Sequence, residues 1–343
     1  MFKKILNKAV KTNNLNIEEI MFLLKVEEKN FKVLCSIANR VRQEYLGNNV
    51  HMRGIIEFSN YCSRSCKYCG LRKENKELER YRIELDEIIN LGIYAGKIGY
   101  KTIVLQSGED NYEADKIEYI TKKLKKEADV AVTLSLGERD FAEYKLWKKA
   151  GADRYLLKHE IADKDKYNNL HPGMSYEERI KRLRWLKELG YQTGSGNIIG
   201  LPEQNEETIA QDIELFKDLD LEMIGIGPLI AHGRTPLKNV ENGSVKMTLK
   251  TMAITRLLLP QAFLPSTTAL NSLDSRGRQK GLQAGANVIM PNITPPEYRS
   301  LYEIYPGKRP PEGKIKNEYI ETKTMIESLG RKVASGYGHI KKD

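Results

Sequence analysis

The sequence contains few cysteines, four in 343 residues, and three of them fall within eight positions. So small and uneven a set excludes the disulfide framework of a small secreted protein. No run of about 18 apolar residues is present, which excludes a membrane-spanning helix. The first ten residues lack the apolar core and cleavage site of a secretory signal. We therefore expect a cytoplasmic protein.

Two nucleotide-binding patterns are also missing. No G-x-G-x-x-G follows the first expected strand, and no G-x4-G-K-[ST] occurs. These absences argue against a dinucleotide-binding fold and a P-loop NTPase. The net charge is +10, with 56 Lys and Arg against 46 Asp and Glu. Because acids and bases are interspersed, the charge indicates solvated surfaces more than a nucleic-acid partner, and an anionic small substrate fits its sign equally well.

Strand and helix patterns alternate along most of the chain. Stretches of helical period, such as 85–95 and 176–189, separate short apolar runs rich in β-branched residues. Eight strands, each followed by a helix, predict an α/β fold of the (β/α)8 TIM-barrel type; an open doubly wound sheet is the alternative. The expected strands are 54–59, 102–107, 130–136, 154–159, 192–199, 223–230, 264–270 and 287–292.

The two ends of the chain carry helical patterns without visible chemistry. Asn16 is placed as an N-cap and Gly47 as a helix stop. Cys35 lies in an apolar helical run, which predicts a buried small hydrophobic residue. We expect an N-terminal helical extension at 1–48, the barrel at 49–306, and a C-terminal helical cap with a loose basic end at 307–343.

The clustered cysteines have the spacing C-x3-C-x2-C, at Cys62, Cys66 and Cys69, directly after the first expected strand. Three thiolates on one loop can hold three irons of a cubane iron–sulfur cluster, which leaves the fourth iron open for a substrate. A Cys3His zinc site completed by His159 or His232 is the alternative.

Other polar and glycine-rich segments follow the later strands. The active sites of (β/α)8 barrels lie at the carboxyl ends of the strands, so these segments and the cysteine loop should share one mouth. The segments are 106–110, 133–138, 158–160, 194–197, 232, 267–268 and 290–292.

The cysteine motif, with Tyr68 before its last cysteine and a barrel to follow, resembles the radical S-adenosylmethionine (radical SAM) superfamily. The resemblance implies an enzyme with one [4Fe-4S] cluster, held by the three cysteines, that cleaves SAM to a 5′-deoxyadenosyl radical. It places residues 107–110 and Arg179 at the methionine group of SAM and 196–203 beside its adenine. The implied cofactor contacts are Tyr68, Ser107, Gly108, Glu109, Ser135, Glu160, Arg179, Gly196, Ile198 and Gly200.

Each of these contacts also has a plainer interpretation. Glu109 and Glu160, taken singly, could be solvated acids at strand ends, and Arg179 could be a surface residue of a helix. The G-x-I-x-G pattern is weak by itself. Their joint placement at the proper strand ends is what favours the cofactor.

Several longer phrases resemble the HydE family of [FeFe]-hydrogenase maturases, which is related to biotin synthase and methylornithine synthase: 102–110, 132–138, 151–160, 225–228, 266–269, 287–292 and 298–307. This resemblance implies assembly of the diiron subcluster of the H-cluster on an iron–carbonyl–cyanide–cysteine precursor. It also implies partner maturases and a reductant of the flavodoxin or ferredoxin type. The implied substrate contacts are Thr133, Lys158, His159, Thr267, Thr268, Met290, Tyr302 and Tyr305.

The sequence departs from that family at two places, and two other functional hypotheses remain. The tail, including 308–313, has no cysteine, which predicts that no second cluster is present. Position 158 is Lys where Arg is expected, which weakens a bidentate contact there. The alternatives are a radical SAM mutase or sulfur-insertion enzyme acting on a small organic acid, and a non-catalytic, zinc-binding barrel.

Overall fold

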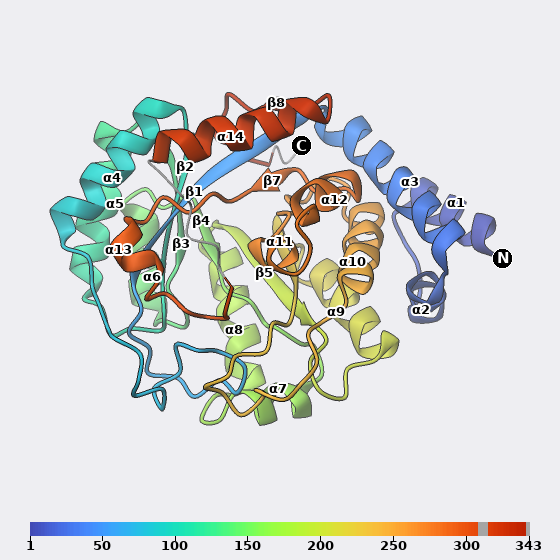
Figure 1. The fold of residues 1–343 in the computed structure, drawn as a ribbon, viewed down its shortest axis with the longest axis horizontal. Helices are drawn as coiled ribbons and strands as arrows, with labels where there is room; N and C mark the ends of the chain where they lie inside the picture. Colours follow the sequence, from blue (N-terminus) through green and yellow to red (C-terminus); the bar gives the residue numbers. More distant parts are fainter. Residues whose placement is uncertain (308–314, 341–343) are drawn as a thin grey trace.

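The computed structural model describes residues 1–307 and 315–340 (Figure 1). Its main sheet is parallel, with the strand order β6-β5-β4-β3-β2-β1-β7. Isolated bridges from Met223 to Phe263 and from Pro265 to Val288 connect β6 to β7, so the ring of strands closes. The predicted (β/α)8-type barrel is therefore confirmed. The strands are β1 Asn49–Ser59, β2 Thr102–Ser107, β3 Ala131–Ser135, β4 Arg154–Leu156, β5 Gln192–Ile199, β6 Met223–Pro228 and β7 Val288–Ile289.

The expected strand at 264–270 is wrong over most of its length. Pro265 has no backbone N–H with which to extend a ladder. The Thr267 hydroxyl accepts a hydrogen bond from the backbone N–H of Leu270 and caps helix α11, Thr268–Leu273. This strand position of the barrel is consequently occupied only by the bridging residues 263–265.

Helices surround the barrel on its outside (Figure 1). Gly99, Gly151, Gly190 and Gly285 stand at the handovers from helix to strand, and all four have positive φ, between 75° and 116°. Glycine adopts this left-handed conformation without a steric cost. The surrounding helices are α4 Leu85–Ile98, α5 Ala114–Glu127, α6 Phe141–Lys149, α7 Lys164–Leu170, α8 Tyr176–Glu188, α9 Glu206–Asp218, α10 Val245–Leu258, α12 Gly277–Gln283 and α13 Pro296–Arg299.

The N-terminal helices are α1 Phe2–Thr12, α2 Ile17–Lys25 and α3 Glu28–Leu46, at the right of Figure 1. Helix α3 packs against α10 and α2 packs against α9, so their apolar residues join the hydrophobic core of the barrel. Asn16 forms the predicted N-cap, completed by Glu19 as a capping box. Cys35 packs partly buried on α3, and burial raises the pKa of its thiol to about 12.

The C-terminal segment contains helix α14, Ile315–Ser328, and strand β8, Lys332–Val333, which pairs with the start of β1. After β8 the chain crosses the amino ends of the strands. There Arg154 Nη2 donates to the carbonyls of Tyr337 (2.7 Å) and Gly338 (2.8 Å). The expected loose end is wrong up to residue 340, since these contacts hold it. The segments 308–313 and 341–343, on which other expectations fell, lie outside the described residues.

Removing residues 331–343 is expected to destabilise the fold. Arg154 is fully buried, and both carbonyls that accept from its Nη2 belong to this segment. The loss of acceptors for a buried guanidinium should lower the free energy of unfolding by about 2–3 kcal/mol, measured by denaturant unfolding. Arg154→Met should recover part of that loss in the shortened chain, because it removes the unsatisfied charge. No recovery would contradict this explanation.

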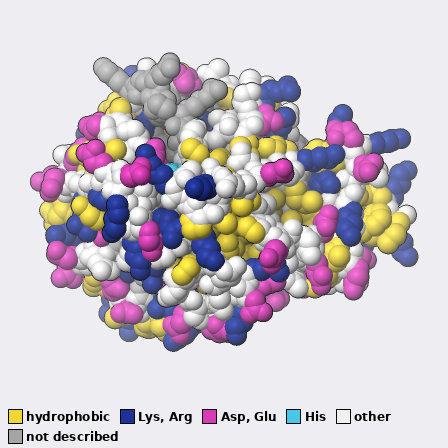
Figure 2. Space-filling model, turned by 60° about the horizontal axis from the view of Figure 1, so that its bottom comes forward, with side chains coloured by type: hydrophobic (Ala, Val, Ile, Leu, Met, Phe, Trp, Pro, Cys, Tyr) yellow, Lys and Arg dark blue, Asp and Glu magenta, His cyan; other side chains and the backbone are white. Residues whose placement is uncertain are grey.

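Basic and acidic side chains are interspersed over the face seen in Figure 2, in line with the expectation from the charge pattern. Within residues 1–307 and 315–340, no helix is both long enough and apolar enough to cross a membrane.

Candidate active site at the mouth of the barrel

The loop that carries Cys62, Cys66 and Cys69 follows β1 and lies at the carboxyl ends of the strands. Backbone hydrogen bonds hold it at three points, to the end of β2, the end of α7 and the segment after α13. A loop bonded to three separate elements has little freedom to move. The bonds are Ser63 N to Glu109 O (3.0 Å), Lys67 N to Leu170 O (2.9 Å) and Gly70 N to Ile304 O (3.0 Å).

The three cysteine side chains are partly buried. Burial, followed by the charges of Cys69 and Cys62, raises the pKa of Cys66 well above its usual value. Among the described residues, no three Cys, His, Asp or Glu side chains converge on a single metal ion. A cubane does not need such convergence, because each thiolate binds a different iron. The three cysteines therefore fit a cubane cluster.

The two histidines considered for a zinc site do not complete one. His232 Nδ1 accepts a hydrogen bond from the backbone of Arg234 (3.1 Å), and its Nε2 lies 3.6 Å from a carboxylate oxygen of Glu303. His159 is fully buried elsewhere, against residues of β5 and α9. In the part of the chain that the structure describes, neither imidazole joins the cysteines in a group that could hold a single metal ion.

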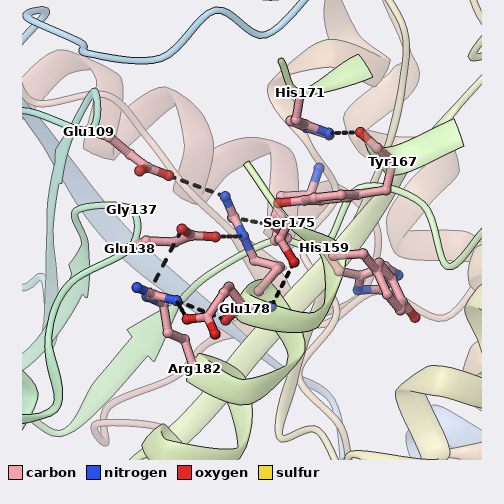
Figure 3. A network of polar contacts seen from close by, with 12 residues as sticks. Glu109, Gly137, Glu138, His159, Tyr167, His171, Ser175, Glu178 and Arg182 are labelled. Atoms are coloured by element: carbon pink, nitrogen blue, oxygen red, sulfur yellow. Dashed lines mark hydrogen bonds and ion pairs between the residues drawn. The ribbon is translucent and has the colours of Figure 1, made fainter. Parts of the chain in front are cut away.

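An ion-pair network includes Glu109 and Glu138 (Figure 3), and Arg64 connects it to the cysteine loop. Arg179, on α8, is 7% exposed. Its Nε donates to Glu138 (2.8 Å), its Nη2 to Glu109 (3.2 Å) and its Nη1 to the carbonyl of Lys158 (2.8 Å). Arg64, from the cysteine loop, pairs with Glu109 and lies 3.5 Å from Glu138. The network joins the ends of β2, β3 and β4 to the loop.

Glu138 and Arg64 were not among the residues predicted for the site. Both lie in segments that pointed to it, since Arg64 stands between the first two cysteines and Glu138 follows the third strand. Their pairing across 74 positions is what the sequence could not reveal.

The Tyr68 side chain is held by a histidine that sequence reasoning also missed. The Tyr68 hydroxyl lies 2.7 Å from His171 Nε2, and His171 Nδ1 lies 2.7 Å from the carbonyl of Tyr167. A carbonyl only accepts, so Nδ1 carries the proton and Nε2 accepts from the tyrosine. Burial lowers the pKa of His171 to about 4, which keeps the ring neutral. Figure 3 shows His171 beside Tyr167.

Close backbone approaches explain the glycines predicted for the site. A Cβ on Gly108 would lie 2.3 Å from the carbonyl oxygen of Tyr61 and 2.8 Å from the Cβ of Cys62. A Cβ on Gly196 would lie 2.0 Å from the carbonyl oxygen of Gly225, on the next strand. Gly200 has φ 96°, which favours glycine.

The remaining predicted cofactor contacts lie on the same rim. The Ser107 hydroxyl donates to the carbonyl of Gly108 (2.7 Å). Ser135 is partly buried as the last residue of β3. Ile198 donates its backbone N–H to the carbonyl of Glu160, which itself has φ 68°.

Gly108→Ala is expected to disturb the cluster loop. The new methyl group would press on Tyr61 and Cys62, which must shift, at a cost of about 1–3 kcal/mol for such overpacking. Reconstituted protein should bind less iron than the wild type, measured by iron analysis. Gly233→Ala is the matched control, since a Cβ there meets no atom within 4 Å. Equal iron contents in the two variants would contradict the expectation.

Most residues predicted to contact substrate lie in or near the barrel mouth. Lys158 Nζ lies 2.9 Å from Glu160 Oε2 and donates to the carbonyl of Asn197 (3.2 Å). Thr133 is buried on β3, and its hydroxyl has no partner among the described residues. The others are Thr267 at the cap of α11, Thr268 as its first residue, Met290 packed beside the cluster of Met223, Phe263 and Val288, the buried Tyr302, and the partly buried Tyr305.

His159 is the exception and requires a correction. Its side chain is fully buried, with Nδ1 2.9 Å from Ser195 Oγ, Nε2 3.4 Å from Asp212 Oδ1, and its ring against Phe216. Successive residues of a strand point to opposite faces, so Lys158 faces the mouth while His159 faces α9. His159 is therefore not positioned to bind substrate.

Comparisons with known proteins agree with this site. Residues 56–216 match the model of the radical SAM superfamily. The chain is 47% identical over 317 residues to the [FeFe] hydrogenase maturase subunit HydE of Thermotoga maritima, with 92% of this chain and 91% of that protein covered. The chain belongs to the radical SAM superfamily. Within it, this similarity places the chain in the HydE family.

Two further relatives support the fold and the family. A 3-methylornithine synthase of Methanosarcina acetivorans is 30% identical over 286 residues, covering 82% of this chain and 81% of that protein. The crystal structure of methylornithine synthase (PylB) superimposes with a TM-score of 0.85 at 25% identity, covering 96% of this chain and 97% of the other. Members of this superfamily use a [4Fe-4S] cluster and SAM, so this radical SAM enzyme has both as cofactors.

Proposed function

We propose that this enzyme acts in the maturation of [FeFe]-hydrogenase, in assembly of the diiron subcluster of its H-cluster. The observation that carries the proposal is the 47% identity to a HydE maturase over 92% of the chain, in a protein whose three motif cysteines meet on one anchored loop. The substrate would be an iron–carbonyl–cyanide complex that carries a cysteine.

In this proposal Cys62, Cys66 and Cys69 hold the cluster. When bound, the cluster and SAM supply the 5′-deoxyadenosyl radical. Glu109 and Arg179 present opposite charges side by side, and these match the ammonium and carboxylate groups of the methionine part of SAM. Gly196 on β5 and Gly200 directly after it, which let the backbones of Gly225 and Gly243 approach closely, would lie beside the adenine. Glu160 offers a carboxylate at the end of β4.

The substrate would lie deeper in the barrel, among hydrogen-bond donors. An anionic metal complex needs donors and positive charge when it leaves water. Lys158 supplies the charge, and Thr133 has a buried hydroxyl that no described residue engages. The proposed lining is completed by Thr267, Thr268, Met290, Tyr302 and Tyr305. Partner maturases, a reductant of flavodoxin or ferredoxin type and a cytoplasmic location complete the proposal.

The decisive experiment is complementation. A hydrogenase-maturation system that lacks its HydE should regain hydrogenase activity when this chain is supplied, measured as hydrogen evolution. The control is the same chain with Cys66→Ala, which should not rescue. Absence of rescue by a wild-type chain that cleaves SAM after anaerobic reconstitution would contradict the maturase proposal while leaving the radical SAM chemistry intact.

Methylornithine synthase suggests a second candidate, a reaction on a small organic acid. The 30% identity and the TM-score of 0.85 favour it. The two candidates differ in the substrate whose consumption is coupled to SAM cleavage. Consumption of an amino acid coupled to SAM cleavage, without rescue of hydrogenase maturation, would favour the second candidate.

A further inference from the structure

A buried polar network lies directly behind the rim residue Glu160. Its centre is Asp212, which is fully buried on α9. One carboxylate oxygen of Asp212 accepts the backbone N–H of Ala162 (2.6 Å), and the other accepts from the side-chain amide of Asn197 (2.7 Å). Removing a carboxylate from water destabilises the folded state unless hydrogen bonds in the protein compensate for the lost hydration. The bonds join the turn after β4 to strand β5.

The histidine misassigned to the substrate belongs to this network. Ser195 Oγ accepts the backbone N–H of His159 (3.0 Å), so its own proton is available to His159 Nδ1 at 2.9 Å. His159 Nε2 faces Asp212 Oδ1 at 3.4 Å. His159 thus lies against Oδ1, the Asp212 oxygen that accepts from Ala162, while Asn197 donates to the other oxygen.

The backbone of Glu160 depends on what surrounds it. Glu160 has φ 68°, a left-handed conformation that a glutamate rarely adopts, and such conformations persist when neighbouring bonds impose them. Its N–H donates to Gly196 O and its carbonyl accepts from Ile198 N, both at 2.9 Å, so it pairs with Asn197 across the strands. Asp212 bonds to both strands of this pair, to Asn197 on β5 and to Ala162 two residues after Glu160.

We propose that Asp212 is a positioning residue that holds the Glu160 carboxylate at the mouth of the barrel for contact with SAM. The proposal deepens the function given above and rests on the assignment of Glu160 to the cofactor. Asp212 touches neither the cofactor nor the substrate, because it lies between the sheet and α9. It acts by fixing the turn that aims Glu160.

The test uses the full chain with a reconstituted cluster and measures SAM affinity without reductant, so that no turnover occurs. Asp212→Asn keeps the shape of the side chain but replaces one acceptor oxygen with a donor, so either Ala162 or Asn197 loses its bond. SAM binding should weaken by about tenfold, as when an outer-shell partner of a ligating group is removed. Glu160→Gln should weaken it by a similar or larger factor.

Two comparisons separate positioning from general damage. In Asp212→Asn combined with Glu160→Gln, the loss should not exceed that of Glu160→Gln alone, because both changes act through one carboxylate. Glu222→Gln is the matched control. Glu222 is a buried acid that accepts the backbone N–H of Thr193 (2.9 Å) at the opposite end of β5, so its loss should leave SAM affinity unchanged.

Each outcome bears on the proposal. Multiplying losses in the double variant, or an unchanged SAM affinity in Asp212→Asn, would overturn the positioning role. An unchanged SAM affinity in Glu160→Gln would also overturn the positioning role. It would not contradict the proposed maturase function, which cluster binding and the complementation experiment test independently. Should Asp212→Asn fail to fold, Asn197→Ala removes only one of the two anchors and carries the same expectation.

Discussion

Cys66→Ala is expected to abolish SAM cleavage and to prevent a complete cluster. The wild-type chain should take up about four irons on anaerobic reconstitution, with three of them held by protein thiolates. Cys66 stands between the other two ligands on a loop bonded to β2, α7 and the segment after α13. An anchored loop cannot bring another thiolate into its place, and the remaining cysteine, Cys35, lies on α3.

The measurements are iron and sulfide content, the absorbance of the cluster, and 5′-deoxyadenosine formed under reductant. Cys35→Ala is the matched control, because it removes a thiol of the same chain that lies outside the site. It should retain the full iron content and full SAM cleavage. A Cys66→Ala protein that binds about four irons and cleaves SAM would refute the cysteine assignment.

Arg179→Gln is expected to weaken SAM binding by about 100-fold, equivalent to about 2.7 kcal/mol. Arg179 supplies the positive charge between Glu109 and Glu138, and all three side chains are largely buried. Neutralising the guanidinium leaves two carboxylates facing each other and removes the charge proposed to meet the SAM carboxylate. The loss of the bond to the Lys158 carbonyl also frees the end of β4.

SAM affinity of the reconstituted protein and its melting temperature are the quantities to compare. Arg179→Lys keeps the charge but not the planar fork, so its affinity should fall between those of the wild type and Arg179→Gln. Arg184→Gln, an exposed arginine on the same helix, is the control and should change neither quantity. If Arg179→Gln binds SAM as the wild type does, Arg179 has no part in the cofactor site.

Much of the fold could be predicted because its signals are local. The helix–strand handovers at Gly99, Gly151, Gly190 and Gly285 require backbone conformations that glycine adopts freely, and the structure confirms all four. The cysteine spacing is likewise a property of a few consecutive residues.

The error at 264–270 arose from local signals that outweigh the strand composition, and the other two errors came from segments whose contacts are with distant residues. The run at 264–270 has the composition of a strand, but a proline and a hydroxyl that caps α11 end it early. His159 follows a polar strand end, yet the alternation of side chains turns it toward α9. The tail beyond Gly330 has loop-like glycines, but the carbonyls of Tyr337 and Gly338 satisfy a buried arginine.

The amino-acid sequence alone was sufficient for the barrel class, and it also predicted the cluster ligands and the end of the barrel that carries the chemistry. Those conclusions rest on spacing within eight residues and on the rule that parallel strands share one carboxyl edge. Only the tertiary structure revealed that Arg179 pairs with Glu109, 70 positions away. The same holds for the hydrogen bond by which Asp212 holds the turn after Glu160. Charge partners and buried anchors are chosen by proximity in space, and one sequence does not encode that proximity in any local pattern.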